Sequence, residues 1–163
     1  IERVRGALNA TLEIRGVPMS SFLRTVAKTH AKEKAQGTMK RVAEYAEAIG
    51  LGERFLDRSV NEGFSGGEKK KSELLQFAAV NPGIALLDEI DAGVDVDSLN
   101  AMARILKKAA SQGTGMLIIS HSARIFKYCA PDFVHIINHG TRVTSGKKAL
   151  LKKVEKEGYK KTV

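Results

Sequence analysis

Two short apolar runs with a helical pattern between them constrain the fold of this chain more than any other feature. Residues 84–87 and residues 116–119 consist only of apolar side chains, and each run has the length of a strand. Between the runs, Leu99, Met102 and Leu106 recur at helical spacing. A strand, a helix and a strand in this order predict two parallel strands joined by a right-handed crossover. We therefore expect an α/β fold with a parallel sheet as its core.

The residues before this unit predict a helical insertion. Ser20 stands at a suitable place to cap a helix whose apolar positions are 22, 23, 26 and 27. A second helix is expected over about residues 38–49, ending at the Gly50-Leu51-Gly52 sequence. Two consecutive helices without a strand between them indicate a helical subdomain over about residues 20–57.

The residues after the unit predict a hairpin and a helix. The apolar residues 133–137 and the residues 142–144 flank a turn sequence, which is typical of a closing hairpin. The lysine-rich residues 147–157 carry Leu150, Leu151 and Val154 at helical spacing, which predicts a solvated amphipathic helix.

Composition excludes several classes of protein. The 163 residues carry a net charge of +9, but residues 51–100 hold 10 acidic and 5 basic side chains. We therefore expect neither a continuous basic face nor a nucleic-acid partner. No apolar run approaches the length needed to cross a bilayer, which predicts no membrane insertion. The single cysteine, Cys129, excludes an intrachain disulfide and fits a cytoplasmic location.

The first candidate site is the sequence Phe64-Ser65-Gly66-Gly67-Glu68. Ser65 and Glu68 have the spacing of a capping box, which starts a helix. Gly66 and Gly67 are poor helix formers, and without Cβ atoms their N–H groups can approach a phosphate at the positive end of the helix. The alternative is an ordinary helix start followed by solvated lysines.

The second and third candidates are polar residues that follow the two predicted strands. Asp88 and Glu89 stand at the end of the first strand, where open α/β sheets bind ligands. One carboxylate can reach Mg²⁺ while the other orients or deprotonates a water. His121 follows the second strand, and it can point toward the same crevice and donate to a phosphate oxygen. Solvated acids and a surface histidine remain the alternatives.

A fourth candidate follows the two carboxylates directly. Residues 91–97 contain three aspartates and Gly93, a composition that favours a tight turn and an N-cap for the next helix.

In this order, the four candidates resemble the C-terminal half of an ABC-type ATPase. The signature motif would be Phe64–Glu68, the Walker B carboxylates Asp88 and Glu89, the D-loop residues 91–95, and the switch histidine His121. Within this family the chain most resembles SufC-like ATPases of the Suf iron–sulfur cluster assembly system. That likeness is carried by the stretches 14–23, 58–71, 131–135 and 157–159.

The resemblance implies a role for each residue. Ser65, Gly66, Gly67 and Glu68 would bind an ATP held by a second protomer, and Asp95 would link the two sites of the dimer. Asp88 would hold Mg²⁺, Glu89 would be the general base, and His121 would sense and polarise the γ-phosphate. The resemblance further implies ATP hydrolysis in the cytoplasm with SufB- and SufD-like scaffold proteins as partners.

Two departures from the family pattern stand out. The chain contains no G-x-x-x-x-G-K-[ST] sequence, the P-loop with which ABC ATPases grip their own nucleotide. It also lacks the family's Q-loop glutamine, whose position falls near Asn9. We therefore expect residues 1–163 to be an incomplete ABC ATPase domain, comprising the helical subdomain (about residues 20–57) and the catalytic and C-terminal part (residues 58–163). Alone it should neither bind ATP tightly nor hydrolyse it.

Three alternatives remain open. The chain could be the C-terminal lobe of an SMC/Rad50-like DNA-associated ATPase, in which the P-loop lies far upstream, although residues 20–57 show no sustained heptads. It could also be an ATP-binding subunit of a transporter. A third possibility is a scaffold-binding module without enzymatic activity.

Overall fold

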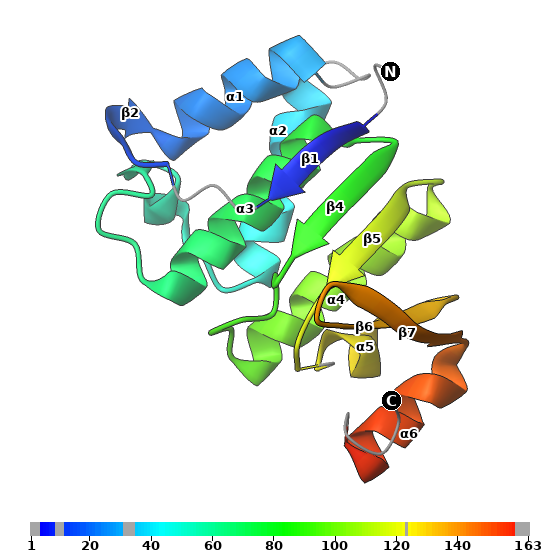
Figure 1. Cartoon of the computed structure of the whole chain (residues 1–163). Coiled ribbons are helices and arrows are strands. Elements are labelled where there is room, and N and C mark those ends of the chain that lie inside the picture. Colours follow the sequence, from blue (N-terminus) through cyan, green and yellow to red (C-terminus); the bar gives the residue numbers. More distant parts are fainter. Residues whose placement is uncertain (1–3, 9–11, 31–34, 123, 159–163) are drawn as a thin grey trace. The chain divides into compact units, whose positions relative to one another are not determined.

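The computed structural model describes residues 4–8, 12–30, 35–122 and 124–158. Figure 1 shows the helices and strands that these residues form. The chain divides into two compact units, residues 1–121 and residues 122–163, and each is described by itself. Asn9, the expected position of the Q-loop glutamine, lies outside the described residues.

A three-stranded parallel sheet forms the centre of the first unit. Its strands are β1 (Val4–Leu8), β4 (Ile84–Asp88) and β5 (Gly115–Ile119), in the order β1-β4-β5. The helix α4 (Val96–Ser111) connects β4 to β5, and Asp88 pairs with Ile119 at the ends of the two strands. The strand–helix–strand unit is therefore confirmed. Strand β1 was not expected, because the Val-Arg-Gly-Ala-Leu sequence lacks a strand pattern.

Three further helices and a short ladder complete this unit. Helix α3 (Gly66–Val80) packs against both α1 (Met19–His30) and α2 (Ala35–Ala48), so the two expected consecutive helices are confirmed. Their core contains fully buried aliphatic side chains from all three helices, among them Leu23, Val42 and Leu75. A 3-10 turn, η1 (Glu53–Phe55), precedes β3 (Ser59–Val60), which pairs antiparallel with β2 (Ile14–Pro18).

The expected N-cap of α1 is wrong. Ser20 lies inside the first turn, because the helix already begins at Met19. The N–H group of Met19 donates to the Arg58 carbonyl at 2.8 Å, and that of Ser20 donates to the Leu56 carbonyl at 2.8 Å. Carbonyl groups of a distant loop thus satisfy N–H groups that a capping side chain would otherwise satisfy.

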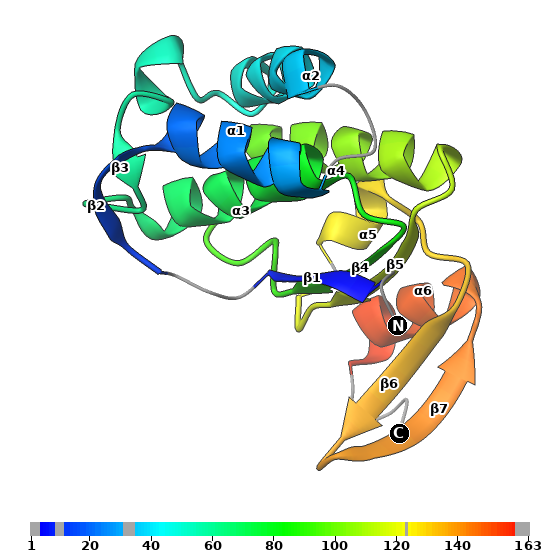
Figure 2. The same ribbon diagram turned by 90° about the horizontal axis from the view of Figure 1, so that it is seen from above.

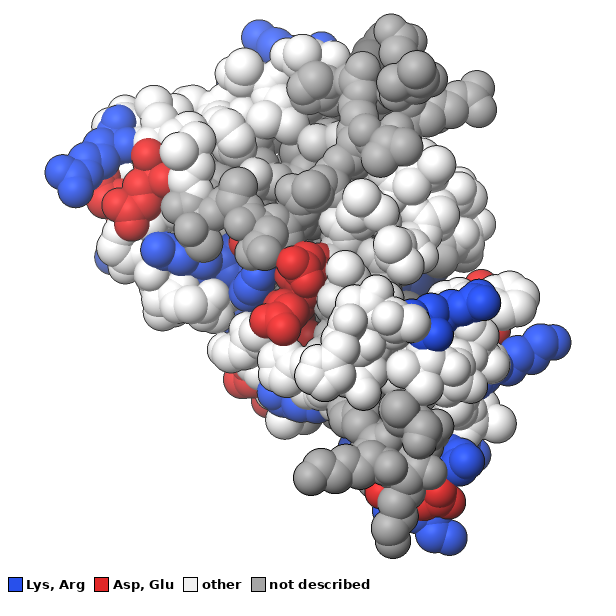
Figure 3. Space-filling model, in the orientation of Figure 1, with Lys and Arg blue, Asp and Glu red and all other residues white. Residues whose placement is uncertain are grey.

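The two faces of the central sheet differ sharply. Figure 2 shows α3 and α4 on the same side of β1, β4 and β5. On the covered face Ala85 and Leu87 are buried, each 1% exposed. On the other face four aliphatic side chains are exposed to solvent: Ile84 (41%), Leu86 (36%), Leu117 (54%) and Ile119 (55%). We call these four residues the open face, and Figure 3 shows mostly uncharged atoms over β4 and β5 in this view.

The second unit is a hairpin with flanking helices. Strands β6 (Val134–Asn138) and β7 (Thr141–Gly146) pair antiparallel, and His139 and Gly140 form the turn between them with φ values of 46° and 74°. The amphipathic helix α6 (Lys148–Glu157) follows and buries Val154. Both predicted elements are confirmed, whereas the short helix α5 (Ile125–Tyr128) was not expected. Over the described residues, no helix combines the length and apolar character needed to span a bilayer.

Candidate functional site

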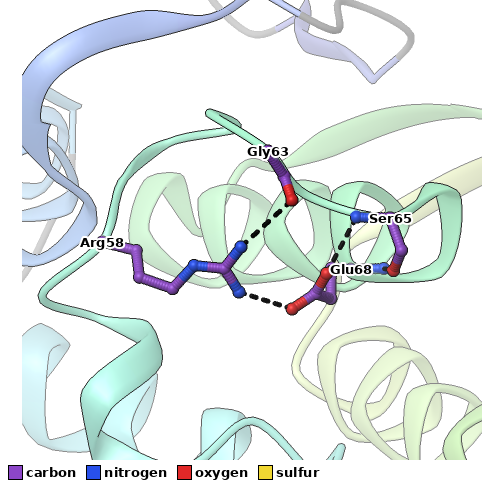
Figure 4. Close-up of polar contacts among 4 residues, drawn as sticks. All are labelled: Arg58, Gly63, Ser65 and Glu68. Atoms are coloured by element: carbon purple, nitrogen blue, oxygen red, sulfur yellow. Dashed lines mark hydrogen bonds and ion pairs between the residues drawn. The ribbon is translucent and has the colours of Figure 1, made fainter.

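The start of α3 is built by reciprocal hydrogen bonds. Ser65 has extended backbone angles, and its hydroxyl accepts from the Glu68 N–H at 3.2 Å. In return, Glu68 Oε2 accepts from the Ser65 N–H at 2.8 Å. The predicted capping box is therefore confirmed, and it determines where the two glycines of the motif enter the helix (Figure 4).

Arg58, for which the sequence predicted no individual role, contacts this helix start from the loop before β3. Its Nη1 lies 2.6 Å from Glu68 Oε1, and its Nη2 donates to the Gly63 carbonyl at 3.2 Å (Figure 4). The guanidinium also lies 4.4 Å from the Phe64 ring centroid, a cation–π distance. The Ser65 N–H, followed by Arg58, lowers the pKa of Glu68. Both Glu68 oxygens thus have partners in the protein, which gives this residue a structural role in addition to the binding role expected for it.

The two glycines of the motif have different surroundings. A Cβ atom on Gly67 would lie 3.1 Å from the Gly93 carbonyl oxygen, which is tighter than ordinary van der Waals contact. A Cβ atom on Gly66 would meet nothing within 4 Å. Gly67 therefore lets the helix start approach the loop after β4, while Gly66 leaves open space in which a ligand could lie.

Glu89 and His121 meet beyond the ends of two neighbouring strands. The Glu89 N–H donates to the Ile119 carbonyl at 2.9 Å, with Glu89 in the left-handed region at φ 47°. Its carboxylate Oε1 lies 2.9 Å from His121 Nδ1. A carboxylate accepts, so the donating Nδ1 carries the hydrogen. Both side chains are substantially exposed.

A half-buried hydrogen bond holds Ser120, the residue next to His121. Ser120 Oγ donates to Asp91 Oδ2 at 2.9 Å, and Asp91 is only 1% exposed. The sequence assigned Asp91 to a turn without assigning it this partner. The contact joins the loop after β4 to the end of β5, so it holds the two strand ends that carry Glu89 and His121.

Lys70 and Glu73 form a second contact that the sequence did not predict, and it lies next to the Asp88 carbonyl. Lys70 Nζ is 3.2 Å from Glu73 Oε2 and 3.5 Å from the Asp88 carbonyl oxygen. The Lys70 and Glu73 side chains are largely buried, and desolvation raises the pKa of Glu73. The sequence Lys69-Lys70-Lys71 indicated solvated charges. Lys70 instead contacts the C-terminal end of β4, so it links α3 to the central sheet.

Asp95 is the N-cap of α4. Its Oδ1 accepts from the Ser98 N–H at 2.8 Å, and its Oδ2 lies 3.6 Å from Lys71 Nζ. The hydrogen bonds from Ser98, with a smaller effect of Lys71, lower the pKa of Asp95 to about 2. The N-cap expected in residues 91–97 is confirmed, and the Lys71 contact provides a second link between α3 and the loop after β4.

The donor set at β4 fits a Mg²⁺ ion that is shared with a phosphate. Asp88 is only partly exposed at the end of β4 and offers hard oxygen atoms. Among the residues that the structure describes, no group of three or more His, Cys, Asp or Glu side chains forms a metal cage. Mg²⁺ in nucleotide sites needs only one or two carboxylates, with phosphate oxygens and waters as the other ligands.

Two curated proteins illustrate what the sequence is similar to. "Probable ATP-dependent transporter ycf16" of Pyropia yezoensis is 39% identical over 161 residues, which cover 94% of this chain and 63% of that protein. "Vegetative protein 296" of Bacillus subtilis is 37% identical over 157 residues, covering 94% of this chain and 60% of that protein. This chain thus spans less than two thirds of these relatives. No protein-family model matches it.

Solved structures share the fold. An ATP-binding subunit of an ABC transporter superposes with a TM-score of 0.79 at 19% identity, covering 98% of this chain and 68% of that one. The chain has the fold of ABC-type ATP-binding domains. A dimeric ATP-binding cassette in a post-hydrolysis state, bound to ADP and Pi, superposes with a TM-score of 0.71 at 17% identity, covering 90% of this chain and 63% of that one.

The ABC-type fold agrees with the expected family and extends over nearly the whole chain. The structure brings Glu89 and His121 together, and it joins the start of α3 to the loop after β4 through Gly67 and Lys71. What Ser65, Gly66, Asp88 and Asp95 do toward a nucleotide stays a prediction.

Proposed function

We propose that this chain supplies the hydrolytic carboxylate and the signature motif of a composite ABC-type ATPase site. The contact between Glu89 Oε1 and His121 Nδ1 at 2.9 Å carries this proposal. It places a carboxylate and an imidazole side by side at the end of a parallel sheet, where α/β folds bind ligands. Asp88 is the preceding residue of the same strand end.

In this proposed function, each residue has a separate role in the transfer of a phosphoryl group to water. Asp88 would hold Mg²⁺, which neutralises phosphate charge when bound. Glu89 orients the attacking water and takes its proton, and the hydrogen bond from His121 Nδ1 holds the Glu89 carboxylate in place. The chain positions these groups, and positioning with charge stabilisation accounts for most of the catalysis in such reactions.

The start of α3 acts on a different nucleotide. Gly66 has open space where its Cβ would be, so its N–H group can approach the γ-phosphate of an ATP held by a second protomer. Ser65 and Gly67 position it, and Glu68 with Arg58 stabilises the helix start. Asp95, linked to α3 through Lys71, couples the two sites.

A chimera tests the hydrolytic role. The part of the Pyropia yezoensis relative that this chain does not match is placed before residue 1 in one polypeptide, and the chimera is expected to release phosphate from ATP. Glu89→Gln in that chimera should slow release by on the order of 10²–10³-fold, because a general base contributes that much. Phosphate release that is unaffected by Glu89→Gln would refute the proposed role.

We further propose that the ATPase serves iron–sulfur cluster assembly with SufB- and SufD-like scaffold proteins in the cytoplasm. The SufC-like stretches of the sequence support this finer assignment. A transporter subunit is the second candidate, favoured by relatives such as "Probable ABC transporter ATP-binding protein spyM18_0273" of Streptococcus pyogenes, 36% identical over 157 residues. Co-purification of the tagged chain with SufB- and SufD-like proteins supports the first, and co-purification with membrane-spanning permeases supports the second.

A further inference from the structure

The Arg58 side chain is held by four contacts beside the start of α3. Its Nη1 lies 2.6 Å from Glu68 Oε1, and its Nη2 donates to the Gly63 carbonyl at 3.2 Å. Its guanidinium carbon lies 4.4 Å from the Phe64 ring centroid and 5.6 Å from that of Phe55. Both rings are buried, and their centroids are 4.5 Å apart. A planar, permanently charged group is thus fixed opposite the Glu68 carboxylate (Figure 4).

The backbone of Arg58 is fixed as well. Its N–H group donates to the Phe55 carbonyl at 3.2 Å, and its carbonyl accepts from the Met19 N–H at 2.8 Å at the start of α1. Many surface ion pairs contribute little, because two long side chains must be ordered to form them. Here the rings and the backbone contacts already hold Arg58 in place, so its pairing with Glu68 is a preorganised feature of the fold.

Glu68 brings a negative charge to the place where the proposed function requires phosphate to bind. It follows Gly66 by two residues, in the same first turn of α3. The hydrogen bond from the Ser65 N–H lowers the pKa of Glu68, so this carboxyl group is ionised at neutral pH. Like charges repel, and a carboxylate in this turn therefore opposes the binding of a phosphate anion unless a cation offsets it.

The lysines that follow Glu68 are paired with other carboxylates. The Nζ atoms of these lysines lie within 3.6 Å of a carboxylate oxygen, in the pairs Lys69–Glu13, Lys70–Glu73 and Lys71–Asp95. Among the residues that the structure describes, Arg58 is the cation that forms an ion pair with Glu68. The charge of Glu68 is therefore offset from the loop before β3, and not from its own helix.

We propose that Arg58 is a positioning residue that offsets the charge of Glu68, so that the first turn of α3 attracts phosphate while the capping box stays intact. Arg58 acts through Glu68 and does not itself bind the phosphate. The carboxylate is retained because it accepts from the Ser65 N–H at 2.8 Å. This inference rests on the phosphate-binding part of the proposed function, and it does not depend on hydrolysis by Glu89.

The test is a titration of the 163-residue chain with tripolyphosphate, which is the phosphate chain of ATP without the nucleoside. Binding is followed by the amide resonance of Gly66 in nuclear magnetic resonance spectra. We expect a saturable shift in the parent chain. Arg58→Met keeps an apolar stem against the two rings, and it should weaken binding by about tenfold, because the Glu68 charge is no longer offset.

A double variant separates the charge of Arg58 from its contacts. Glu68→Gln keeps an oxygen that can accept from the Ser65 N–H but removes the negative charge. Arg58→Met/Glu68→Gln therefore has the same net charge at the helix start as the parent chain, and it should bind tripolyphosphate within about threefold of the parent. Arg104→Met, which removes an exposed arginine of α4, is the matched control and should leave binding unchanged.

Recovery of binding in the double variant supports the proposal, because the contacts of Arg58 are still missing there. A double variant that binds as weakly as Arg58→Met overturns it, since the role of Arg58 would then be purely structural. Unchanged binding by Arg58→Met, or no saturable shift in the parent chain, also overturns it. Equal weakening by Arg104→Met would assign the effect to the net charge of the whole chain and overturn it too.

Two features keep this test independent. Should circular dichroism show that Arg58→Met does not fold, Arg58→Gln replaces it in both the single and the double variant. The titration requires no hydrolysis, whereas Glu89→Gln is tested by phosphate release from the chimera. Failure of this inference and failure of the proposed hydrolytic role are therefore distinguishable.

Discussion

His121 Nδ1 lies 2.9 Å from Glu89 Oε1, although 32 positions separate the two residues in the chain. Pairing of Asp88 with Ile119 brings the ends of β4 and β5 side by side, and each strand is followed by one of these residues. The Glu89 N–H bond to the Ile119 carbonyl and the Ser120–Asp91 bond hold both loops in place. The pair is therefore positioned by the sheet rather than by local sequence.

The histidine is expected to act through the glutamate. In the chimera described above, His121→Ala should slow phosphate release by about 10²-fold, because the Glu89 carboxylate loses the donor that orients it. Combining it with Glu89→Gln should add little, since the two residues act as one unit. Rates measured for both single variants and the double variant check this, and fully additive losses would contradict it. His135→Ala, which removes a histidine bonded to Ser145, is the matched control and should leave the rate unchanged.

The two signature glycines should respond differently to alanine. Gly67→Ala should lower the free energy of unfolding by about 1 kcal/mol, because its Cβ would press on the Gly93 carbonyl at 3.1 Å. Gly66→Ala meets open space and should be neutral or stabilising by up to about 1 kcal/mol through helix propensity. Urea unfolding of both variants measures these effects, and equal destabilisation would contradict the described geometry. Only Gly66→Ala should then impair phosphate release without a loss of stability.

The buried pair of Lys70 and Glu73 should behave as a unit. Glu73→Ala should lower the free energy of unfolding by about 3 kcal/mol, because it removes the carboxylate that compensates the largely buried Lys70 ammonium. The double variant Lys70→Met/Glu73→Leu should recover most of this loss, since an apolar pair of similar volume avoids buried charge. Urea unfolding of the parent, Lys70→Met, Glu73→Leu and the Lys70→Met/Glu73→Leu double variant gives the coupling energy. A coupling near zero would show that the contact contributes nothing.

The lowered pKa of Asp95 predicts that the folded chain loses stability in acid. Its pKa is about 2 in the folded chain and about 3.8 when unfolded, so its contribution is full above about pH 4 to 5 and is lost as the pH falls toward 2. Asp95→Asn keeps a capping oxygen but does not titrate in this range. Thermal melts from pH 6 to pH 2 should therefore show a smaller loss for Asp95→Asn than for the parent chain. Parallel curves for the two proteins would contradict the lowered pKa of Asp95. Glu73, with its raised pKa, acts in the opposite sense and is common to both proteins.

Local signals predicted many of the elements well. The capping box at Ser65 and Glu68 places the start of α3 correctly, because its hydrogen bonds span only three residues. The apolar run before Asp88 and the turn at His139 and Gly140 likewise depend on neighbouring residues alone. Ser20 shows the limit of such signals, since backbone carbonyls from Leu56 and Arg58 take over the role of a side-chain cap.

The candidate site was only partly predictable. Its titratable residues could be selected because they follow strand ends, which the pattern of apolar runs reveals. Arg58, Lys70 and Glu73 could not be selected in this way, since a lone charged residue gives no sign in the sequence that it is half-buried against a particular partner. Strand β1 was missed because its pairing with β4, and not its composition, makes it a strand.

By itself, the sequence determined the parallel α/β architecture, the order of the motifs and the absence of a P-loop among these residues, because each depends on spacing along the chain. Only the tertiary structure decided that Glu89 contacts His121, that Gly67 lies against Gly93, and that α3 and α4 cover the same face of the sheet. These relationships depend on which strands pair and which face the helices cover. The apolar runs in β4 and β5 place apolar side chains on both faces, so three-dimensional packing was needed to show which face α3 and α4 cover.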